Sequence, residues 1–366
     1  MAEVSFNNVW KIYDKSVEAV KDLSFCCKDR EFFAILGPSG CGKSSSLRML
    51  AGLEEISRGD VFIKGRRVND LSSRERNVAM SFENYGLYPD FTVYDNIAYP
   101  LKIHKVKPDE IKKQVLDIAK RLRLTDVLNY KPSALSSGQK QRVSIARALV
   151  RNPDVTIMDE PLSHLDAKMR SHMRSVIKRL HNNMGLTTVY VTHDQIEAMT
   201  MADKILIMDG GYAQQIGTPD EVYSEPANLF VAGFIGTPQM NLLSGVVNDG
   251  GDVFVCPDAF DLPMPAYAGK VAAGQAVTLG IRPHDIEVFS EPVEGAVQGS
   301  VYVVELLGET TIISIRVGGN VLKVEVEGLQ TGWNFDDTVY FRIHAVKAHL
   351  FDNESTLRIV PLGAEL

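Results

Sequence analysis

Gly37-Pro38-Ser39-Gly40-Cys41-Gly42-Lys43-Ser44 is the stretch that decides the fold of this chain. It satisfies the phosphate-binding loop pattern G-x-x-x-x-G-K-[ST] at every required position. The apolar run Phe32–Leu36 before it predicts a buried strand, and residues 45–51 after it predict a helix. In such a unit the backbone N–H groups of the loop and the helix N-terminus point at phosphate oxygens. Lys43 would reach the β- and γ-phosphates, and the Ser44 hydroxyl would bind Mg²⁺. The alternative interpretation is an ordinary Gly-rich turn before a helix.

The bulk composition is that of a soluble globular protein. The chain has 366 residues, of which 45% are hydrophobic and 23% charged, so two or more domains are expected. Its net charge of −7 provides no global basic field for nucleic acid. Residues 1–5 lack the regions of a signal peptide, and no apolar run approaches the ~20 residues that span a bilayer. We expect the four cysteines (Cys26, Cys27, Cys41 and Cys256) to be buried, reduced thiols in the cytosol.

Polar residues follow several predicted strands. The apolar run Val155–Met158 ends in Asp159 and Glu160, which in a phosphate-loop protein would hold Mg²⁺ and polarise the attacking water. The alternative is a strand that ends in a solvated acidic turn. Glu83 closes the predicted strand 77–82, and His193 closes the strand 187–192, where it is placed like a γ-phosphate sensor, although a lone His is usually structural. Because catalytic groups of open α/β sheets gather at the carboxyl ends of strands, we expect these side chains to converge with Gly37.

Two further segments carry weaker signals. Leu135–Gln139 predicts a loop that caps the amphipathic helix 140–149, and so forms a second helix N-terminus able to bind an anion; taken alone, an ordinary helix start explains it. Tyr13 could stack on an adenine ring, although such an aromatic is more often part of the core or surface. Val4–Phe6 and Val17–Val20 resemble edge strands.

Changes of pattern along the chain predict its domains. Residues 84–91 form a loop with unusual apolar content, which is either a partner surface or a loop folded over the core. Residues 92–104 and 109–124 have helical periodicity, so a helical subdomain at about 88–150 is expected inside the first domain. From about Gly245, short apolar runs separated by Gly, Asp and Asn predict an all-β barrel or sandwich. We place the boundary near Gly236-Thr237-Pro238, which predicts domains at 1–236 and 237–366.

The ordered set of motifs resembles that of ABC transporter ATPase subunits. The set comprises the phosphate loop, Leu135–Gln139, Asp159-Glu160, Ser163–Asp166 and His193, and the Leu135–Gln139 signature separates this family from other P-loop proteins. The resemblance is closer to the ATPases of bacterial carbohydrate importers of the maltose and glycerol-3-phosphate type, as shown by segments 84–89, 159–163, 191–195 and 280–283. It covers nearly the whole chain. It implies an α/β P-loop ABC ATPase domain with a helical subdomain, followed by a C-terminal all-β, OB-like regulatory domain.

The resemblance also implies a role for each matching residue. Tyr13 would stack on adenine, Asp159 would be a metal ligand, Glu160 the general base, and His193 a contact of the γ-phosphate. The phosphates of ATP and Mg²⁺ would be bound by Gly37, Pro38, Ser39, Gly40, Cys41, Gly42, Lys43, Ser44 and Ser45. The signature residues would contact ATP held by the other subunit of a head-to-tail dimer, and they are Ser136, Ser137, Gly138 and Gln139.

Two residues depart from the family pattern. Glu83 stands where the family has Gln; it keeps an oxygen ligand for Mg²⁺ but adds negative charge beside the phosphates, which should weaken nucleotide binding unless Mg²⁺ offsets it. Ser137 stands where the family has Gly, and its side chain could crowd the approach to the γ-phosphate in the partner's site. We hypothesise that the chain works beside a non-identical ATPase subunit, although a homodimer is the usual arrangement in this subgroup.

The implied function is ATP hydrolysis that powers import of a sugar, polyol or glycerol-type solute from the cytoplasmic face of the inner (plasma) membrane. The implied partners are two transmembrane permease subunits, a second ATPase subunit and, indirectly, an external solute-binding protein. The Tyr85–Phe91 region would receive a coupling helix from each permease subunit. The alternatives are a weakly hydrolysing regulatory half of a heterodimeric pair and a soluble ABC ATPase that acts on nucleic acid. The acidic balance and the absence of a basic stripe with stacking aromatics argue against nucleic acid.

Overall fold

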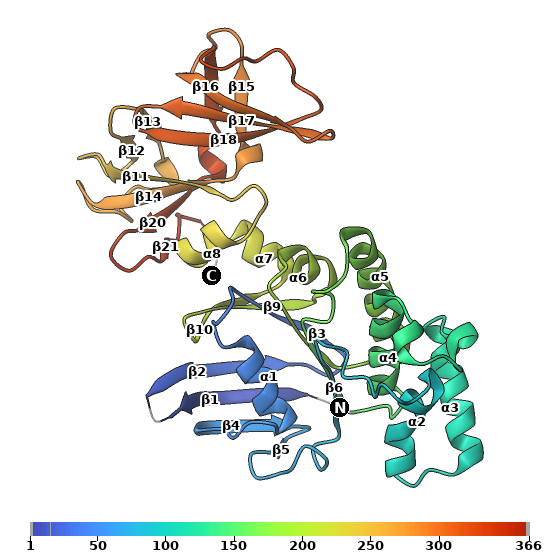
Figure 1. The fold of residues 1–366 in the computed structure, drawn as a ribbon. Coiled ribbons are helices and arrows are strands. Elements are labelled where there is room, and N and C mark those ends of the chain that lie inside the picture. Colours follow the sequence, from blue (N-terminus) through green and yellow to red (C-terminus); the bar gives the residue numbers. More distant parts are fainter. Residues whose placement is uncertain (1–2, 15, 364–366) are drawn as a thin grey trace. The chain divides into compact units, whose positions relative to one another are not determined.

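The computed structural model describes residues 3–14 and 16–363, which form two compact units. One unit extends to Asp220 and the other begins at Glu221, and each has its own hydrophobic core. The first unit mixes helices and strands, and the second is built almost wholly of strands (Figure 1). The predicted order of an α/β domain followed by an all-β domain is therefore confirmed.

A six-stranded, mostly parallel sheet forms the centre of the first unit. Its strand order is β10-β9-β3-β8-β7-β6, and only the β10–β9 pair is antiparallel. The strands are β3 (Phe32–Leu36), β6 (Val78–Ser81), β7 (Val155–Asp159), β8 (Thr188–Thr192), β9 (Lys204–Asp209) and β10 (Tyr212–Gly217). The carboxyl ends of five neighbouring parallel strands thus lie at one edge of the sheet.

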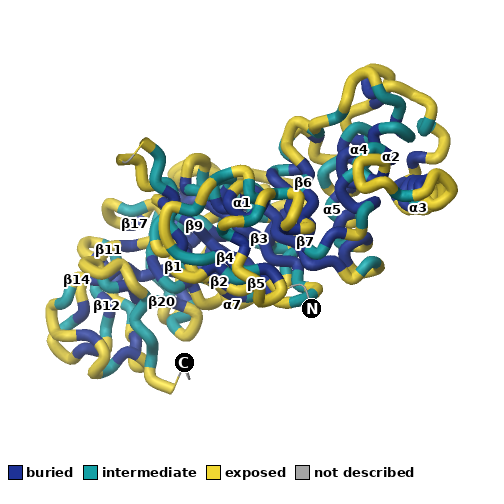
Figure 2. Tube along the Cα trace, turned by 90° about the horizontal axis from the view of Figure 1, so that it is seen from below, coloured by how far each residue is buried: buried dark blue, intermediate teal, exposed yellow. Residues whose placement is uncertain are grey.

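Side chains from this sheet enter two different cores. Phe32 and Tyr190 belong to a cluster with helical residues between 93 and 122, whereas their neighbours Phe33 and Val189 belong to a second cluster that includes helical residues 47–51. Successive residues of a strand point to opposite faces, so both faces of the sheet are apolar. Figure 2 shows β3 and β7 as buried along their length, as expected for parallel strands that are covered on both sides.

Helices and a second sheet complete the first unit. The helices are α1 (Lys43–Ala51), α2 (Val93–Ile103), α3 (Pro108–Arg121), α4 (Ser137–Leu149), α5 (Ala167–Met184) and α6 (Gln195–Met201). The second sheet is antiparallel in the order β2-β1-β4-β5 and contains β1 (Val4–Tyr13), β2 (Val17–Cys27), β4 (Arg58–Ile63) and β5 (Arg66–Arg67). Among the described residues, no helix is both long and apolar enough to cross a membrane.

Two expectations about the N-terminal strands are wrong. β1 is not an edge strand, because it pairs with β2 on one side and β4 on the other. Cys26 is exposed while Cys27 is buried, because the two adjacent residues of β2 face opposite sides of the strand. No described cysteine forms a disulfide.

Two antiparallel sheets form most of the second unit. Their strand orders are β13-β12-β11-β14-β20-β21 and β15-β19-β16-β17-β18. The first sheet contains β11 (Asn241–Val247), β12 (Val253–Cys256), β13 (Phe260–Pro263), β14 (Ala276–Ile281), β20 (His349–Asp352) and β21 (Arg358–Ile359). The second contains β15 (Ile286–Phe289), β16 (Val297–Leu306), β17 (Thr310–Val317), β18 (Asn320–Glu327) and β19 (Thr338–Ile343). Two short helices precede the sheets, α7 (Pro219–Ser224) and α8 (Leu229–Phe234).

The segment 221–236 is bonded to the second unit, although the sequence places the domain boundary after it. Arg282, which is buried directly after β14, donates to the carbonyl oxygens of Ile235 and Tyr223, the latter at 2.7 Å. Its guanidinium also lies 4.1 Å from the centre of the Tyr223 ring. Arg282 therefore bonds residues near both ends of this segment to the end of β14, which explains why the second unit begins at Glu221.

Replacement of Arg282 by Ala should destabilise the second unit by about 2–4 kcal/mol, because two buried carbonyl groups lose their charged donor. Hydrogen exchange of β14 and β20 in the full chain, measured in increasing denaturant, would report this loss. The matched control is Arg316→Ala, which removes an exposed arginine stacked 4.9 Å from the Tyr302 ring. Equal effects of the two substitutions would contradict the anchoring role of Arg282.

Candidate active site

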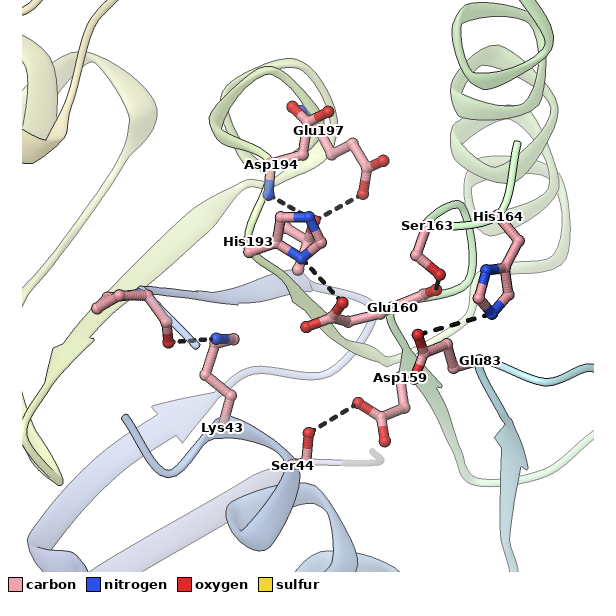
Figure 3. Close-up of polar contacts among 12 residues, drawn as sticks. Lys43, Ser44, Glu83, Asp159, Glu160, Ser163, His164, His193, Asp194 and Glu197 are labelled. Atoms are coloured by element: carbon pink, nitrogen blue, oxygen red, sulfur yellow. Dashed lines mark hydrogen bonds and ion pairs between the residues drawn. The ribbon is translucent and has the colours of Figure 1, made fainter. Parts of the chain in front are cut away.

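The phosphate-binding loop joins β3 to α1, as its pattern predicts. Lys43 is the first residue of α1, and its buried Nζ donates to the carbonyl oxygens of Gly37 and Pro38, each at 2.8 Å. Figure 3 draws its side chain together with Ser44, Asp159 and Glu160. The ammonium group of Lys43 is therefore held by backbone carbonyl groups of the loop, at the end of β3.

Gly42 meets a double constraint at the start of α1. Its φ of 105° lies in the region that favours glycine, and a Cβ there would be 2.4 Å from the carbonyl oxygen of Ala19. Any side chain would therefore strain the backbone and collide with β2. This local geometry explains why the motif needs glycine immediately before its lysine.

The carboxylate of Asp159, at the end of β7, faces the loop. The Ser44 hydroxyl donates to Asp159 Oδ1 at 3.2 Å. Burial raises the pKa of Asp159, the bond from Ser44 lowers it, and the negative charges of Glu160 and Glu83 raise it further. Two further carboxylates are thus close enough to affect the ionisation of Asp159, which is a suitable environment for a cation.

Glu160 follows β7 in a strained backbone conformation. Its φ is 42°, in the left-handed region, and the backbone is held there by a bond from its N–H to the Val191 carbonyl at 3.0 Å. The Ser163 hydroxyl donates to the Glu160 carbonyl at 3.0 Å. The side chain pairs with His193, whose Nδ1 is 2.8 Å from Oε2 (Figure 3). The ends of β7 and β8 thus bring the predicted base and the predicted sensor into direct contact.

A buried carboxylate supports the end of β8, and the sequence interpretation missed it. Glu197 accepts from the Tyr190 hydroxyl at 2.7 Å and from the Thr192 hydroxyl at 2.8 Å. Burial raises the pKa of Glu197. The Thr192 hydroxyl also accepts from the Asp194 N–H at 2.9 Å. These bonds fix the backbone on both sides of His193. The one sequence signal for this role was the position of Glu197, an acidic residue in the first turn of α6.

Glu83 pairs with a histidine that was not predicted as a site residue. His164 Nε2 lies 3.7 Å from Glu83 Oε1, and the imidazole also meets the Tyr85 ring edge-on at a centroid distance of 6.2 Å. Both side chains of the pair are about half exposed, at 53% for His164 and 52% for Glu83. The segment before α5 thus contacts the loop after β6, two segments that the sequence interpretation treated separately.

Tyr13 lies at the end of β1, next to the first turn of α1. Its hydroxyl is 3.2 Å from the Ser45 hydroxyl, and Lys11 Nζ is 4.6 Å from the ring centre. The residue is partly exposed. The structure therefore places the predicted adenine contact beside the phosphate-binding loop.

The signature residues are in a different place. Ser136 caps α4 in a reciprocal capping box with Gln139, and Ser136 and Ser137 are both exposed. Gly138 is buried, and Met169 packs so closely on it that a Cβ at this position would lie 2.9 Å from Met169 Sδ. In Figures 1 and 2 α4 lies away from α1, and within the described residues no hydrogen bond joins the signature to residues 37–45. A single chain does not combine its own loop and signature.

The oxygen donors at the sheet edge fit Mg²⁺. Among the described residues no group of three His, Cys, Asp or Glu side chains forms a complete metal site. Mg²⁺ prefers oxygen ligands and is usually held by one or two carboxylates together with substrate phosphates. Ser44 and Asp159 supply a hydroxyl and a carboxylate 3.2 Å apart, and Glu83 is near enough to shift the pKa of Asp159.

Comparison with known proteins identifies the family. The ABC transporter model matches residues 20–163, the MalK OB fold domain model matches residues 236–286, and the TOBE domain model matches residues 279–351. The oligosaccharides import ATP-binding protein MsmX of Bacillus subtilis is 45% identical over 98% of this chain and 100% of its own length. The chain belongs to the ABC transporter ATP-binding subunits. The predicted OB-like character of the C-terminal domain is also confirmed.

Further relatives agree with this family assignment. The trehalose/maltose import ATP-binding protein MalK of Thermococcus litoralis is 48% identical over 87% of this chain and 89% of its own. A dimeric, post-hydrolysis structure of the ATP-binding cassette MJ0796 bound to ADP and Pi is 32% identical, with a TM-score of 0.53. It covers 59% of this chain and 98% of that cassette. The match extends beyond the phosphate-binding loop to a whole ATP-binding cassette.

Replacement of Glu83 by Gln should tighten Mg-ATP binding about threefold to fivefold at low salt, because one partly exposed negative charge leaves the surroundings of Asp159. Replacement of His164 by Ala should weaken binding, because Glu83 loses a basic neighbour. Titration calorimetry would measure both effects, with Asp126→Asn as a control for loss of one exposed carboxylate from the same unit. Unchanged affinity in Glu83→Gln would contradict this charge argument.

Proposed function

We propose that this chain hydrolyses ATP to power import of a sugar, polyol or glycerol-type solute through a bacterial ABC transporter. The observation that carries the proposal is the Glu160–His193 contact of 2.8 Å at the sheet edge that also holds Lys43, Ser44 and Asp159. The oligosaccharide and trehalose/maltose import relatives support a carbohydrate-like solute. The chain would act from the cytoplasmic face of the membrane.

Each site residue has a chemical task in this proposal. Lys43 and the N–H groups of Gly37 and residues 39–45 would bind the phosphates, and Tyr13 would pack on the adenine. Ser44 and Asp159, with Glu83 beside them, would hold Mg²⁺, which when bound neutralises charge on the β- and γ-phosphates. The Glu160 carboxylate would take a proton from the attacking water. His193 would orient that carboxylate through Nδ1 and leave its other ring nitrogen for the γ-phosphate.

A second ATPase subunit is needed to complete each site. The exposed N-terminus of α4, with Ser136, Ser137 and Gln139, would face nucleotide bound to the phosphate-binding loop of that subunit. The dimeric cassette structure among the neighbours supports this arrangement. ATP would therefore bind between two subunits, and hydrolysis would release them from each other.

Replacement of Glu160 by Gln should reduce ATP turnover by about 100-fold to 10,000-fold, because a neutral amide cannot accept the proton of water. ATP affinity should be retained, since Lys43, Ser44 and Asp159 are untouched. Steady-state phosphate release and nucleotide binding would be measured on the assembled transporter, with Glu305→Gln as a control for loss of an exposed carboxylate. Full hydrolysis by Glu160→Gln would remove Glu160 from the mechanism.

An open groove supports the proposed permease contact. It has a volume of about 380 Å³ and is lined by residues that include Phe82, Tyr88, Tyr99, Ile103 and Arg147. The partly buried Arg147 holds one wall, because it donates to the carbonyl oxygens of Gly86 and Tyr85, the latter at 3.2 Å, and lies 5.5 Å from the Tyr88 ring. A short amphipathic helix of a permease would fit such a groove. The groove includes Gly86 and Tyr88, which belong to the predicted Tyr85–Phe91 contact region.

Replacement of Ile103 by Ser should weaken co-purification with the two permease subunits while ATP binding by the free chain is unchanged. Ile103 is 49% exposed in the groove, so its loss removes apolar contact area without opening the core. Leu116→Ser is the matched control, because Leu116 is 42% exposed on α3 and does not line the groove. Equal loss of permease with both variants would argue against this docking site.

A weakly hydrolysing half of a heterodimeric ATPase pair is the second candidate. Two observations favour it, the Glu83–His164 pair and Ser137 at the exposed start of α4. Each would alter one of two composite sites, Glu83 in this chain and Ser137 opposite the partner's nucleotide. Purification of the assembled transporter decides between the candidates: a complex that contains this ATPase chain alone, in two copies, excludes the heterodimer.

A further inference from the structure

A basic cavity of about 410 Å³ lies in the first unit, away from the site described above. It is formed by residues 120–123 at the end of α3, by Arg142 of α4 and by residues between His172 and Asn183 of α5. Its lining includes Lys120, Arg121, Arg123, Arg142, His172 and Arg179, and no acidic residue. In a chain with a net charge of −7, such a concentration of positive charge is a local feature rather than a consequence of composition.

Most of these cations have no acidic partner among the residues that the structure describes. Arg121 pairs with Asp117 at 2.8 Å, but Lys120, Arg123, Arg142 and Arg179 form no ion pair with any described residue. Burial lowers the pKa of Arg142, and the nearby positive charge of Arg123 lowers it further. The cations therefore repel one another, and an anion placed among them would relieve that repulsion.

The end of a helix dipole does not account for the cluster. Lys120 and Arg121 stand in the last turn of α3, where basic residues are favoured by the helix dipole. Arg142 belongs to the first half of α4, and Arg179 lies inside the long helix α5. Three helices thus contribute cations to one concave surface, and Arg142 and Arg179 lie outside the last turns of α4 and α5.

Arg142 connects this cavity to the signature segment. Its Nε donates to the Gly138 carbonyl at 3.3 Å, and its Nη1 donates to the Leu122 carbonyl at 3.4 Å. Both bonds are longer than an optimal N–H···O bond, so the guanidinium can exchange them for an anion. Gly138 lies within the signature Leu135–Gln139, so Arg142 links the cavity to the signature.

We propose that this cavity binds a small oligoanion, a molecule with two or more phosphate or carboxylate groups, and that its binding changes the signature segment through Arg142. Arginine forks bind such groups with paired hydrogen bonds, and Ser175 and Asn183 add neutral donors to the same lining. The volume admits a small molecule rather than a folded partner. The site goes beyond the proposed ATPase reaction, and binding to it requires no turnover.

Calorimetry on the full chain can test the proposal with tripolyphosphate and citrate as probes. The background is Lys43→Ala, which removes the cation of the phosphate-binding loop and so keeps that loop from dominating the signal. We expect at least one probe to bind at low salt, and its affinity to fall about tenfold or more when Arg142→Gln and Arg179→Gln are added. The probe that binds identifies phosphate or carboxylate as the preferred group.

The matched control removes two positive charges from the same helical region. Lys112 and Lys113 are exposed on α3 and do not line the cavity, so Lys112→Gln with Lys113→Gln should leave affinity unchanged. Because Arg179 is exposed, the single variant Arg179→Gln should retain the fold and still weaken binding of the probe. Failure of both probes to bind, or an equal loss in the lysine control, overturns the proposal.

Hydrogen exchange locates the bound probe independently. We expect the same Lys43→Ala chain to exchange more slowly at residues 120–123, 138–142 and 172–183 when the probe is added. Slower exchange confined to residues 37–45 would instead place the probe in the phosphate-binding loop and refute the cavity site. Protection of the cavity without any change at residues 138–139 would refute the link through Arg142.

Discussion

The shared direction of β9, β3, β8, β7 and β6 is the constraint on which the active site depends. Because these neighbouring strands are parallel, whatever follows each of them emerges at the same edge of the sheet. The phosphate-binding loop, Glu83, Asp159-Glu160 and His193 are far apart in sequence, but each comes directly after one of these strands or close to its end. The sheet itself is packed against a hydrophobic core on each face.

The same arrangement brings three carboxylates close together, and a different neighbouring group contacts each of them. Ser44 donates to Asp159, His193 contacts Glu160, and His164 lies beside Glu83. Glu160 also has a strained, left-handed backbone conformation. Hydrogen bonds with the Val191 carbonyl and the Ser163 hydroxyl stabilise this conformation. A site that is acidic by itself is well suited to a nucleotide that arrives with its own divalent cation.

Sequence reasoning worked where a motif determines its own local structure. The phosphate-binding loop and the acidic end of β7 are short segments whose residue types require one geometry, whereas α4 begins at Ser137, three residues earlier than predicted. Sequence reasoning failed where a residue's partner lies in a distant part of the chain. Alternation in Val4–Phe6 does not tell whether one or two strands pair with it, and β1 is paired on both sides. Nothing near His164 or Arg147 in sequence indicates their contacts with the loop after β6.

The sequence by itself determined the fold class, the order of the domains and the residues at the strand ends, because hydrophobic period and motif spacing are local properties of the chain. Only the tertiary structure decided which of those residues meet. It joined Glu160 to His193 and Glu83 to His164, and it kept the signature away from the phosphate-binding loop of its own chain. It also gathered Arg123, Arg142 and Arg179 around one cavity. Such contacts depend on strand order and helix packing, which bring together residues that no sequence window contains.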